Sequence, residues 1–217
     1  MKLFVIFVVA GMAFAFDSFP GESSGVGYLL PGTDDVFDSY AYKESEVFSS
    51  VPAAYSEFAV CDDFTATGSG DVIIDTYTSW GFTTGSNPAE LELLVIADNS
   101  GPDGAPVSQT SYPCTLYDSG FTYAGYTVWV TVMDLSSDPA VVMSGETVWF
   151  GHHRNDGGTW AAGCGTTVTG SEGYRTVASG WAWAPFSESL ESGDIFKIVE
   201  GSTSLERSTW AGIKNMF

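Results

Sequence analysis

The sequence is poor in positive charge, because its 217 residues include 7 lysines and arginines against 27 aspartates and glutamates, a formal net charge of −20. A surface this acidic repels nucleic acids and anionic lipids, and we expect neither as a partner. The acidic residues can be interpreted in two ways, as ligands of cation sites or as a charged surface that keeps the protein soluble.

Long apolar runs are missing after the first residues, MKLFVIFVVAGMAFAF. There a single lysine precedes an apolar stretch that is shorter than the about 20 residues that a bilayer-spanning helix requires. The stretch ends at a small-x-small site, Ala13-Phe14-Ala15. This pattern predicts a secretory signal peptide over residues 1–15 and a mature chain that is secreted or held at the cell surface, with no transmembrane segment.

Cysteine is also scarce, with three copies whose spacings match no zinc pattern. An exported chain meets oxidising conditions, which favour one disulfide bridge and one remaining thiol. Cys114 follows Pro113 at the junction of a loop and a strand, and Cys164 lies in a glycine-rich loop, so we expect a Cys114–Cys164 bridge. Cys61 stands among alternating apolar residues and is expected in the core.

What the sequence has in abundance is period-2 alternation of apolar and polar residues, the pattern of half-buried strands. In the first clear run it places Val72, Ile74, Trp80 and Phe82 on one face. Turn-forming clusters of glycine, proline, asparagine and aspartate separate the runs, and no helical period lies between them. The pattern predicts an all-β protein, an antiparallel two-sheet β-sandwich of jelly-roll type. The expected strands lie in the segments 72–82, 90–98, 126–133, 147–151, 179–186 and 194–201.

The expected domain organisation follows these patterns. After the signal peptide, residues 16–52 form an N-terminal arm or the first strands, and residues 53–201 form the sandwich. Residues 202–217 form a tail in which the apolar period changes to that of a short amphipathic helix. One face of that helix carries the residues expected to dock or to be sorted, Trp210, Ile213, Lys214 and Phe217.

Three stretches together resemble a family of secreted bacterial β-sandwich domains of mostly unassigned function. They are 60-VCDDFT-65, 94-LVIADNSGPDGAPV-107 and 143-MSGETVWFG-151, with Trp80 in a strand between the first two. Members tend to have an A-D-D-F opening strand, a Y-A-D-N-G-G-x-P-G turn and a late L-x-A-G-T-Y-W strand. The resemblance covers about residues 55–200 and implies a fold and an extracellular setting, without catalytic residues.

The chain departs from that pattern at three places. Cys61 stands where the family has alanine and Ile96 where it has tyrosine, and the turn is altered to Ser100-Gly101-Pro102-Asp103-Gly104. The end of the chain, 209-TWAGIKNMF-217, resembles the short W-x-x-I-K endings of some exported bacterial proteins. That resemblance implies a sorting or anchoring role for the tail.

The stretch 149-WFGHHRNDGGTW-160 holds both histidines and is the first candidate for chemistry. His152 and His153 are neighbours in a strand, so they point to opposite faces and cannot easily share a metal ion. The alternative is a strand that leaves the core, with Arg154 and Asp156 as polar residues at its exit. We favour this structural interpretation.

Calcium is the cofactor that the composition suits best, because hard cations bind oxygen-rich loops of β-sandwiches. In the alternative interpretation the same side chains stabilise turns by bonding to the backbone. The candidate ligands are Asp62, Asp63, Asp98, Asn99 and Asp103.

Two further sites depend on which face of a strand is exposed. Trp181 and Trp183 are two residues apart and share a face, which is a sugar-binding platform if it points outward and core if it points inward. Glu90 and Glu92 share a strand face and could act as paired carboxylates on a glycoside. A solvated sheet face explains the two glutamates equally well.

Three function classes remain. We expect a non-catalytic structural or binding protein of the cell surface, with a glycan or a surface protein as its partner. A self-assembling filament or surface-layer subunit that lends residues 16–52 to the next copy as a donor strand is the alternative. A glycoside-acting enzyme ranks last, because no acid, base and nucleophile converge in the sequence.

Overall fold

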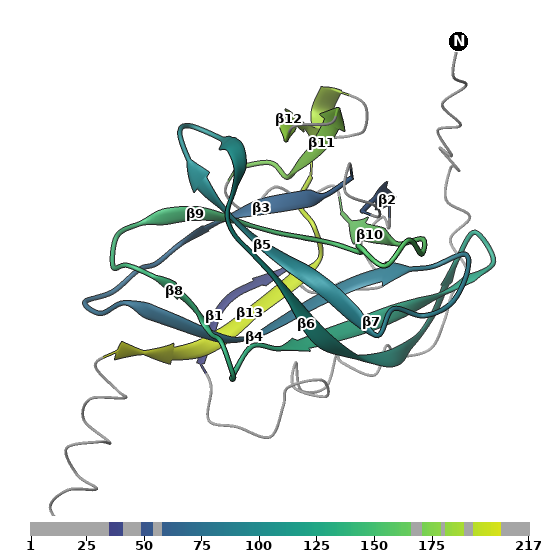
Figure 1. Ribbon diagram of the computed structural model, residues 1–217, viewed down its shortest axis with the longest axis horizontal. Coiled ribbons are helices and arrows are strands. Elements are labelled where there is room, and N and C mark those ends of the chain that lie inside the picture. Colours follow the sequence, from purple (N-terminus) through teal and green to yellow (C-terminus); the bar gives the residue numbers. More distant parts are fainter. Residues whose placement is uncertain are drawn as a thin grey trace, which may run out of the picture.

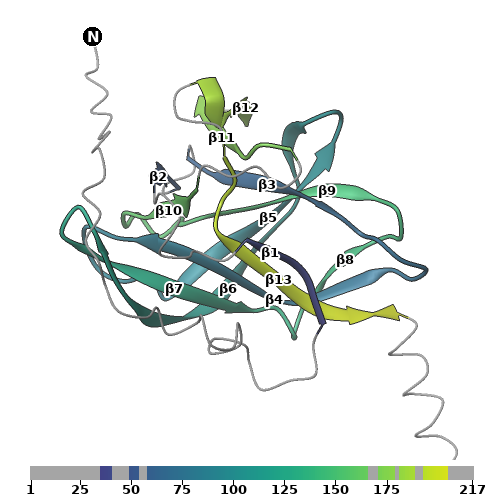
Figure 2. The same ribbon diagram turned by 180° about the vertical axis from the view of Figure 1, so that it is seen from behind.

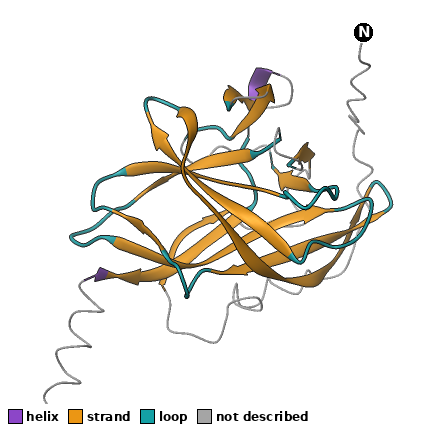
Figure 3. Ribbon diagram, in the orientation of Figure 1, coloured by secondary structure: helices purple, strands orange, loops and turns teal. Residues whose placement is uncertain are grey.

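The structure is a computed structural model, and it describes residues 35–40, 49–53, 58–165, 171–178, 181–188 and 193–204. The described chain is antiparallel β-structure with almost no helix, as Figure 3 shows. The all-β prediction is therefore confirmed. No helix in these ranges is long and apolar enough to cross a bilayer. The predicted signal peptide and the tail residues 205–217 lie outside the described residues.

The described strands are separated mostly by short turns, and one 3-10 helix, η1 (Phe186–Glu188), follows β12. The strands are β1 (Asp35–Tyr40), β2 (Ser49–Pro52), β3 (Val60–Thr65), β4 (Val72–Phe82), β5 (Glu90–Asp98), β6 (Pro102–Tyr123), β7 (Tyr126–Asp134), β8 (Ala140–Val142), β9 (Thr147–His153), β10 (Ala161–Cys164), β11 (Tyr174–Ala178), β12 (Ala182–Pro185) and β13 (Lys197–Thr203).

The strands are hydrogen-bonded along one path, β1-β13-β4-β7-β6-β5-β9-β3-β11-β12, which does not close on itself in the described part of the chain. β6 is 22 residues long, and its first half pairs with β5 while its second half pairs with β7. β6 therefore joins two parts of the path, β1-β13-β4-β7 on one side of it and β5-β9-β3-β11-β12 on the other. β1 and β2 pair with β13 and β10, so parts of the segment 16–52 act as first strands within the chain.

The core lies where the two parts of this path face each other. In Figures 1 and 2, β3, β5 and β9 run above β4, β7 and β13. The largest apolar cluster takes Phe64, Leu93 and Phe150 from the upper strands and Ile74 and Val199 from the lower ones. Because alternate residues of each strand point into this cluster, the intervening residues of β5 and β9 form an outer face on which the candidate site is built.

The apolar side chains of β4 lie on one side of the strand at its start and on the other side at its end. Ile74 pairs with Gly201 and Thr76 with Glu200, so Asp75 is an extra residue in the ladder, a β-bulge. The bulge reverses the alternation. Ile74 packs in the main core, whereas Trp80 packs in a second cluster with Phe82, Val128, Val130, Phe196 and Ile198. The prediction that Val72, Ile74, Trp80 and Phe82 share one face is wrong for this reason.

The predicted Cys114–Cys164 disulfide is not formed, because all three cysteines are free thiols in the structure. The Cys164 side chain is buried in the main core, and the Cys114 thiol donates to the Pro88 carbonyl at 3.4 Å. Burial raises the pKa of Cys164 to about 12, so that thiol stays protonated. The expectation that Cys61 is a core residue is confirmed, since its side chain is fully buried.

Candidate functional site

The two histidines at the end of β9 point to opposite faces of the sheet, as their adjacency predicts. His152 is fully buried, and its Nδ1 lies 3.3 Å from the Tyr77 hydroxyl in the core. Burial first, and the neighbouring His153 second, lower the pKa of His152 to about 3. His152 is therefore a neutral core residue at physiological pH. His153 lies on the outer face, where its Nε2 contacts the carboxylate of Glu92 on β5.

Glu92 is the centre of a polar cluster on that outer face. Besides His153, its carboxylate accepts hydrogen bonds from Gln109 Nε2 at 2.7 Å and from Asn155 Nδ2 at 3.1 Å. Burial opposes the charge, but the three donors outweigh it and lower the pKa of the Glu92 carboxyl. The cluster thus fixes an ionised carboxylate on β5 between side chains from β6, β9 and the loop after β9, and 15% of the Glu92 side chain remains exposed.

Two tryptophans lie next to the His153 imidazole that contacts this carboxylate. The Trp181 ring is 6.0 Å from the imidazole of His153 and stacks on Trp183, with ring centroids 6.0 Å apart and an interplanar angle of 27°. Both rings are partly buried against an apolar cluster on the same outer face, which includes Leu94 and Trp149. The prediction left them as either platform or core. In the structure they lie on the outer face and are half-buried there.

The hairpin of β11 and β12 carries these tryptophans over the sheet. Trp183 Nε1 donates to the Gly104 carbonyl at the start of β6, at 2.8 Å, which ties the hairpin to its neighbour. Trp181 has a φ of 60°, in the left-handed region that residues other than glycine rarely adopt. Such strain, of order 1–3 kcal/mol, is found at ligand-binding and catalytic positions.

The calcium candidates are placed in two different environments. On β3, Asp62 points inward and accepts a hydrogen bond from Lys197, whereas Asp63 points outward and accepts the Ser171 backbone N–H. Asp63 and the β5–β6 turn are two strand spacings apart, roughly 10 Å, because β9 runs between β3 and β5. The two groups of candidates therefore do not form one shared site.

In the turn itself, Asp98 accepts hydrogen bonds from the Gly101 backbone at 3.1 Å and from Trp149 Nε1 at 2.8 Å. Asn99 Nδ2 lies 3.5 Å from Asp103 Oδ2. Within the described ranges, no three histidine, cysteine, aspartate or glutamate side chains gather where they could hold a metal ion. The turn-stabilising interpretation describes these contacts, and calcium binding stays a prediction.

Arg154 and Asp156 form a structural clamp at the exit of β9. The guanidinium is 2% exposed and donates two hydrogen bonds to Asp156, at 2.5 and 2.8 Å. It also donates to the carbonyls of Ser86 and Thr159, at 2.6 and 3.1 Å. A Cβ on Gly158 would lie 2.1 Å from the Arg154 guanidinium carbon, so a larger residue there would displace the guanidinium from its partners. The clamp fixes the loop that supplies Asn155 to the Glu92 cluster.

Sequence reasoning found some of these residues and missed the way they combine. The alternation of 90-ELELL-94 puts Glu92 on a wet face, and the adjacency of the histidines puts one of them there too. The partners Gln109 and Asn155 come from other strands and loops, and nothing local singles them out. The buried pair Asp62–Lys197 was also missed, although a lysine within the apolar run 195-IFKIV-199 was a visible signal.

The comparisons with known proteins identify no family for this chain: no protein-family model matches it, and no curated protein does.

Proposed function

We propose that this protein is an extracellular, non-catalytic binding module that holds a glycan on the outer face formed by β5, β6, β9 and the β11–β12 hairpin. The observation that carries the proposal is the stacked pair Trp181–Trp183 next to the His153 imidazole that contacts the carboxylate of Glu92. An indole ring offers a flat apolar surface to the C–H face of a pyranose, and a fixed carboxylate accepts hydrogen bonds from its hydroxyls.

Preorganisation supports binding at this place. Gln109, Asn155 and His153 already hold Glu92 in one orientation, so a ligand does not have to order that side chain. The amide groups of Gln109 and Asn155 add donors and acceptors of the kind that sugar hydroxyls need. Because the chain carries a net charge of −20, the proposed ligands are neutral or cationic glycans and not acidic ones.

The lowered pKa of Glu92 favours binding over glycoside hydrolysis. A general acid in a glycosidase needs a raised pKa so that it holds a proton at working pH. The three donors around Glu92 act in the opposite direction and keep it ionised. A permanently charged acceptor suits recognition of hydroxyl groups.

The proposal includes the architecture and the setting. We assign the fold to the jelly-roll type of two-sheet β-sandwich, supported by the long β6 that contributes to both parts of the sheet path. Export is supported by the signal-like residues 1–15 and by the resemblance to secreted bacterial β-sandwich domains.

The experiment is an array of neutral polysaccharides, with β-glucan, xylan, mannan and chitin as probes and heparin as the acidic comparison. We expect binding to at least one neutral probe, with a change in tryptophan fluorescence. Trp181→Ala and Glu92→Gln should each weaken that binding by about tenfold or more, equivalent to about 1.4 kcal/mol. Circular dichroism of each variant shows that the fold is retained.

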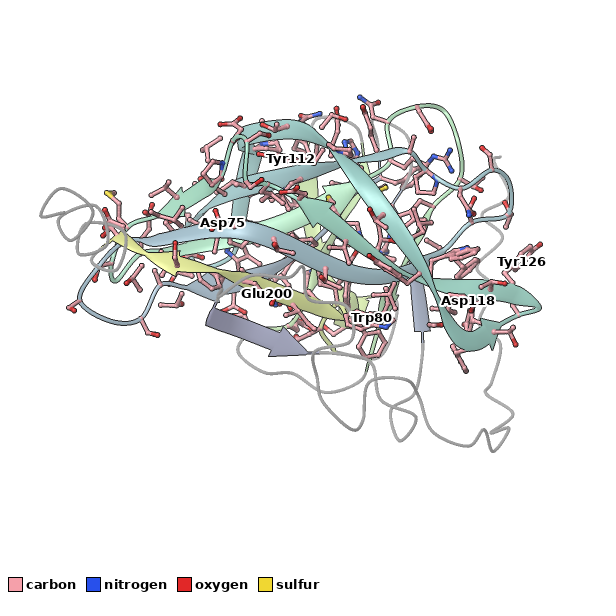
Figure 4. The ribbon with its side chains drawn as sticks, turned by 90° about the horizontal axis from the view of Figure 1, so that it is seen from below. Asp75, Trp80, Tyr112, Asp118, Tyr126 and Glu200 are labelled. Carbon is pink, nitrogen blue, oxygen red and sulfur yellow. The ribbon has the colours of Figure 1, made fainter. Side chains whose placement is uncertain are left out.

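Tyr126→Ala is the matched control. Tyr126 is 41% exposed, stacks on Phe82, and lies at the tip of the β6–β7 hairpin (Figure 4). It pairs with Tyr123 at the end of β6, whereas Glu92 pairs with Ser111 in the first half of that strand. Its removal takes away an exposed aromatic ring but should leave binding unchanged. An array without any bound probe, or binding that survives both Trp181→Ala and Glu92→Gln, would contradict the proposal.

A self-assembling subunit is the second candidate. β1 is the last strand at one end of the sheet path and pairs with β13, so the same strand of another copy could take its place. Assembly predicts polymers that grow with protein concentration in electron micrographs and that disappear when residues 16–52 are removed. A monomer at all concentrations would eliminate this candidate.

A further inference from the structure

A lysine and an aspartate meet in the core, on the side of β3 opposite to the cluster that carries Trp181 and Trp183. Lys197 Nζ donates to Asp62 Oδ2 at 2.6 Å, and the two side chains are 2% and 1% exposed. Asp62 lies on β3 and Lys197 on β13, which are not neighbours in the sheet path. The contact therefore joins the two facing parts of the path through the core.

The surroundings of the pair are apolar. Side chains two residues apart on a strand share a face, so Asp62 lies between Val60 and Phe64 on β3. In the same way, Lys197 lies between Ile195 and Val199. All four of these apolar residues belong to the main core cluster. Water has little access to the pair. Two full charges at such a place lose most of their hydration, and an ion pair there gains little net stability over apolar residues.

A third carboxyl accompanies the pair. Asp194 is 1% exposed, precedes Lys197 by three residues, and its charge acts on Asp62. Burial raises the pKa of Asp62 to about 7, with Lys197 opposing the rise and Asp194 adding to it. Burial therefore makes the protonated form of the Asp62 carboxyl easier to reach near neutral pH than it is for an aspartate in water. Transfer of one proton from Lys197 to Asp62 gives a neutral acid that faces a neutral amine.

We propose that Lys197 and Asp62 condense into an intramolecular amide, an isopeptide bond that links β13 to β3. The lone pair of Lys197 Nζ attacks Cγ of the protonated Asp62 carboxyl, which is bonded to the oxygen that Nζ already contacts. The C–N bond forms, the C–OH bond breaks, and the hydroxyl leaves as water with a proton from the nitrogen. Asp194 carries that proton between the two groups. No oxidant, reductant or co-reactant is consumed.

The buried setting favours the forward reaction. It replaces two groups that are costly to ionise in an apolar core with one neutral amide, and it releases a water molecule to the solvent. The same exclusion of water protects the amide from hydrolysis. The link closes a loop between residues that are 135 apart in sequence, so it ties an early strand to the last described strand. This suits a protein exposed to proteases and to pulling forces, and it is independent of the glycan proposal.

Intact-mass spectrometry of the full-length chain, as purified and after incubation at neutral pH, tests the inference. We expect a mass lower by one water molecule than that of the unlinked chain. After proteolysis, fragmentation should identify a branched peptide that joins Asp62 to Lys197. Hydroxylamine separates this amide from a cyclic imide of aspartate, because it cleaves the imide and leaves the amide intact.

Two variants complete the test. Lys197→Met removes the nucleophile and should restore the full mass, while Asp194→Asn keeps both reacting groups and should slow the loss of water. A folded wild-type chain that retains its full mass after long incubation would overturn the proposal, as would a water loss that maps to other residues. An Asp194→Asn variant that condenses as fast as the wild type would remove Asp194 from the reaction.

Discussion

Replacing Arg154 by methionine tests whether the exit of β9 is held by buried carbonyl contacts or by an ion pair. The guanidinium bonds the carbonyls of Ser86 and Thr159 from a side chain that is 2% exposed, whereas its carboxylate partner Asp156 is 50% exposed. Methionine has a similar length but no donor, so both carbonyls lose their partner in Arg154→Met.

The two kinds of contact differ in their expected magnitudes. A buried acceptor left without its donor costs about 1–3 kcal/mol. With two such carbonyls, we expect Arg154→Met to lower the free energy of unfolding by about 3 kcal/mol. The half-exposed carboxylate is screened by water, and exposed ion pairs contribute about 0–1 kcal/mol. Asp156→Asn should therefore cost less than about 1 kcal/mol.

Urea unfolding of the wild type and both variants measures these differences, provided that the urea dependence of the free energy is the same in all three. The Asp156→Asn variant decides whether the buried carbonyl contacts or the ion pair hold the loop. If Asp156→Asn destabilises the chain as much as Arg154→Met does, the ion pair holds the loop and the reasoning from burial is wrong. A loss below about 1 kcal/mol for Arg154→Met would refute it as well.

Two further predictions concern the core. The chain has two histidines, and NMR should show the His152 imidazole neutral from pH 8 down to pH 5, because its pKa is about 3. Since the unfolded chain takes up a proton at this position below about pH 6.5 and the folded chain does not, His152 lowers stability as the pH falls through that value. His152→Gln identifies the signal, and a titration of that signal between pH 5 and 8 would contradict the prediction. In Gly201→Ala the new Cβ would lie 1.9 Å from the Ile73 carbonyl oxygen, a backbone atom, so we expect a loss of about 1–3 kcal/mol in thermal or urea unfolding. In Gly85→Ala the nearest atom is 3.9 Å away, and an equal loss in that variant would show that crowding is not the cause.

The positions of the strands could be predicted because they depend on local sequence. The expected segments 72–82 and 90–98 coincide with β4 and β5, and 126–133 with nearly all of β7. The glycines, prolines and aspartates of the segment 98–106 favour a turn, yet β6 begins at Pro102 and continues for 22 residues. The chain turns at Ser100 and Gly101, and Gly104 also has a positive φ. The β5–β6 register passes from Asp103 directly to Ser108, so residues 104–107 form an irregularity before regular pairing with β5 continues.

The sequence by itself determined that the chain forms strands, that His152 and His153 separate onto two faces, and that Glu92 lies on a polar face. All three follow from the alternation of side chains along extended backbone, which is a property of neighbouring residues. Only the tertiary structure decided which residues meet across strands. The bulge at Asp75 reverses the faces of β4, the register of β5, β6 and β9 assembles the Glu92 cluster, and the facing of β3 and β13 buries Lys197 against Asp62. These contacts depend on register and on packing between residues far apart in the chain, and a local pattern carries no information about either.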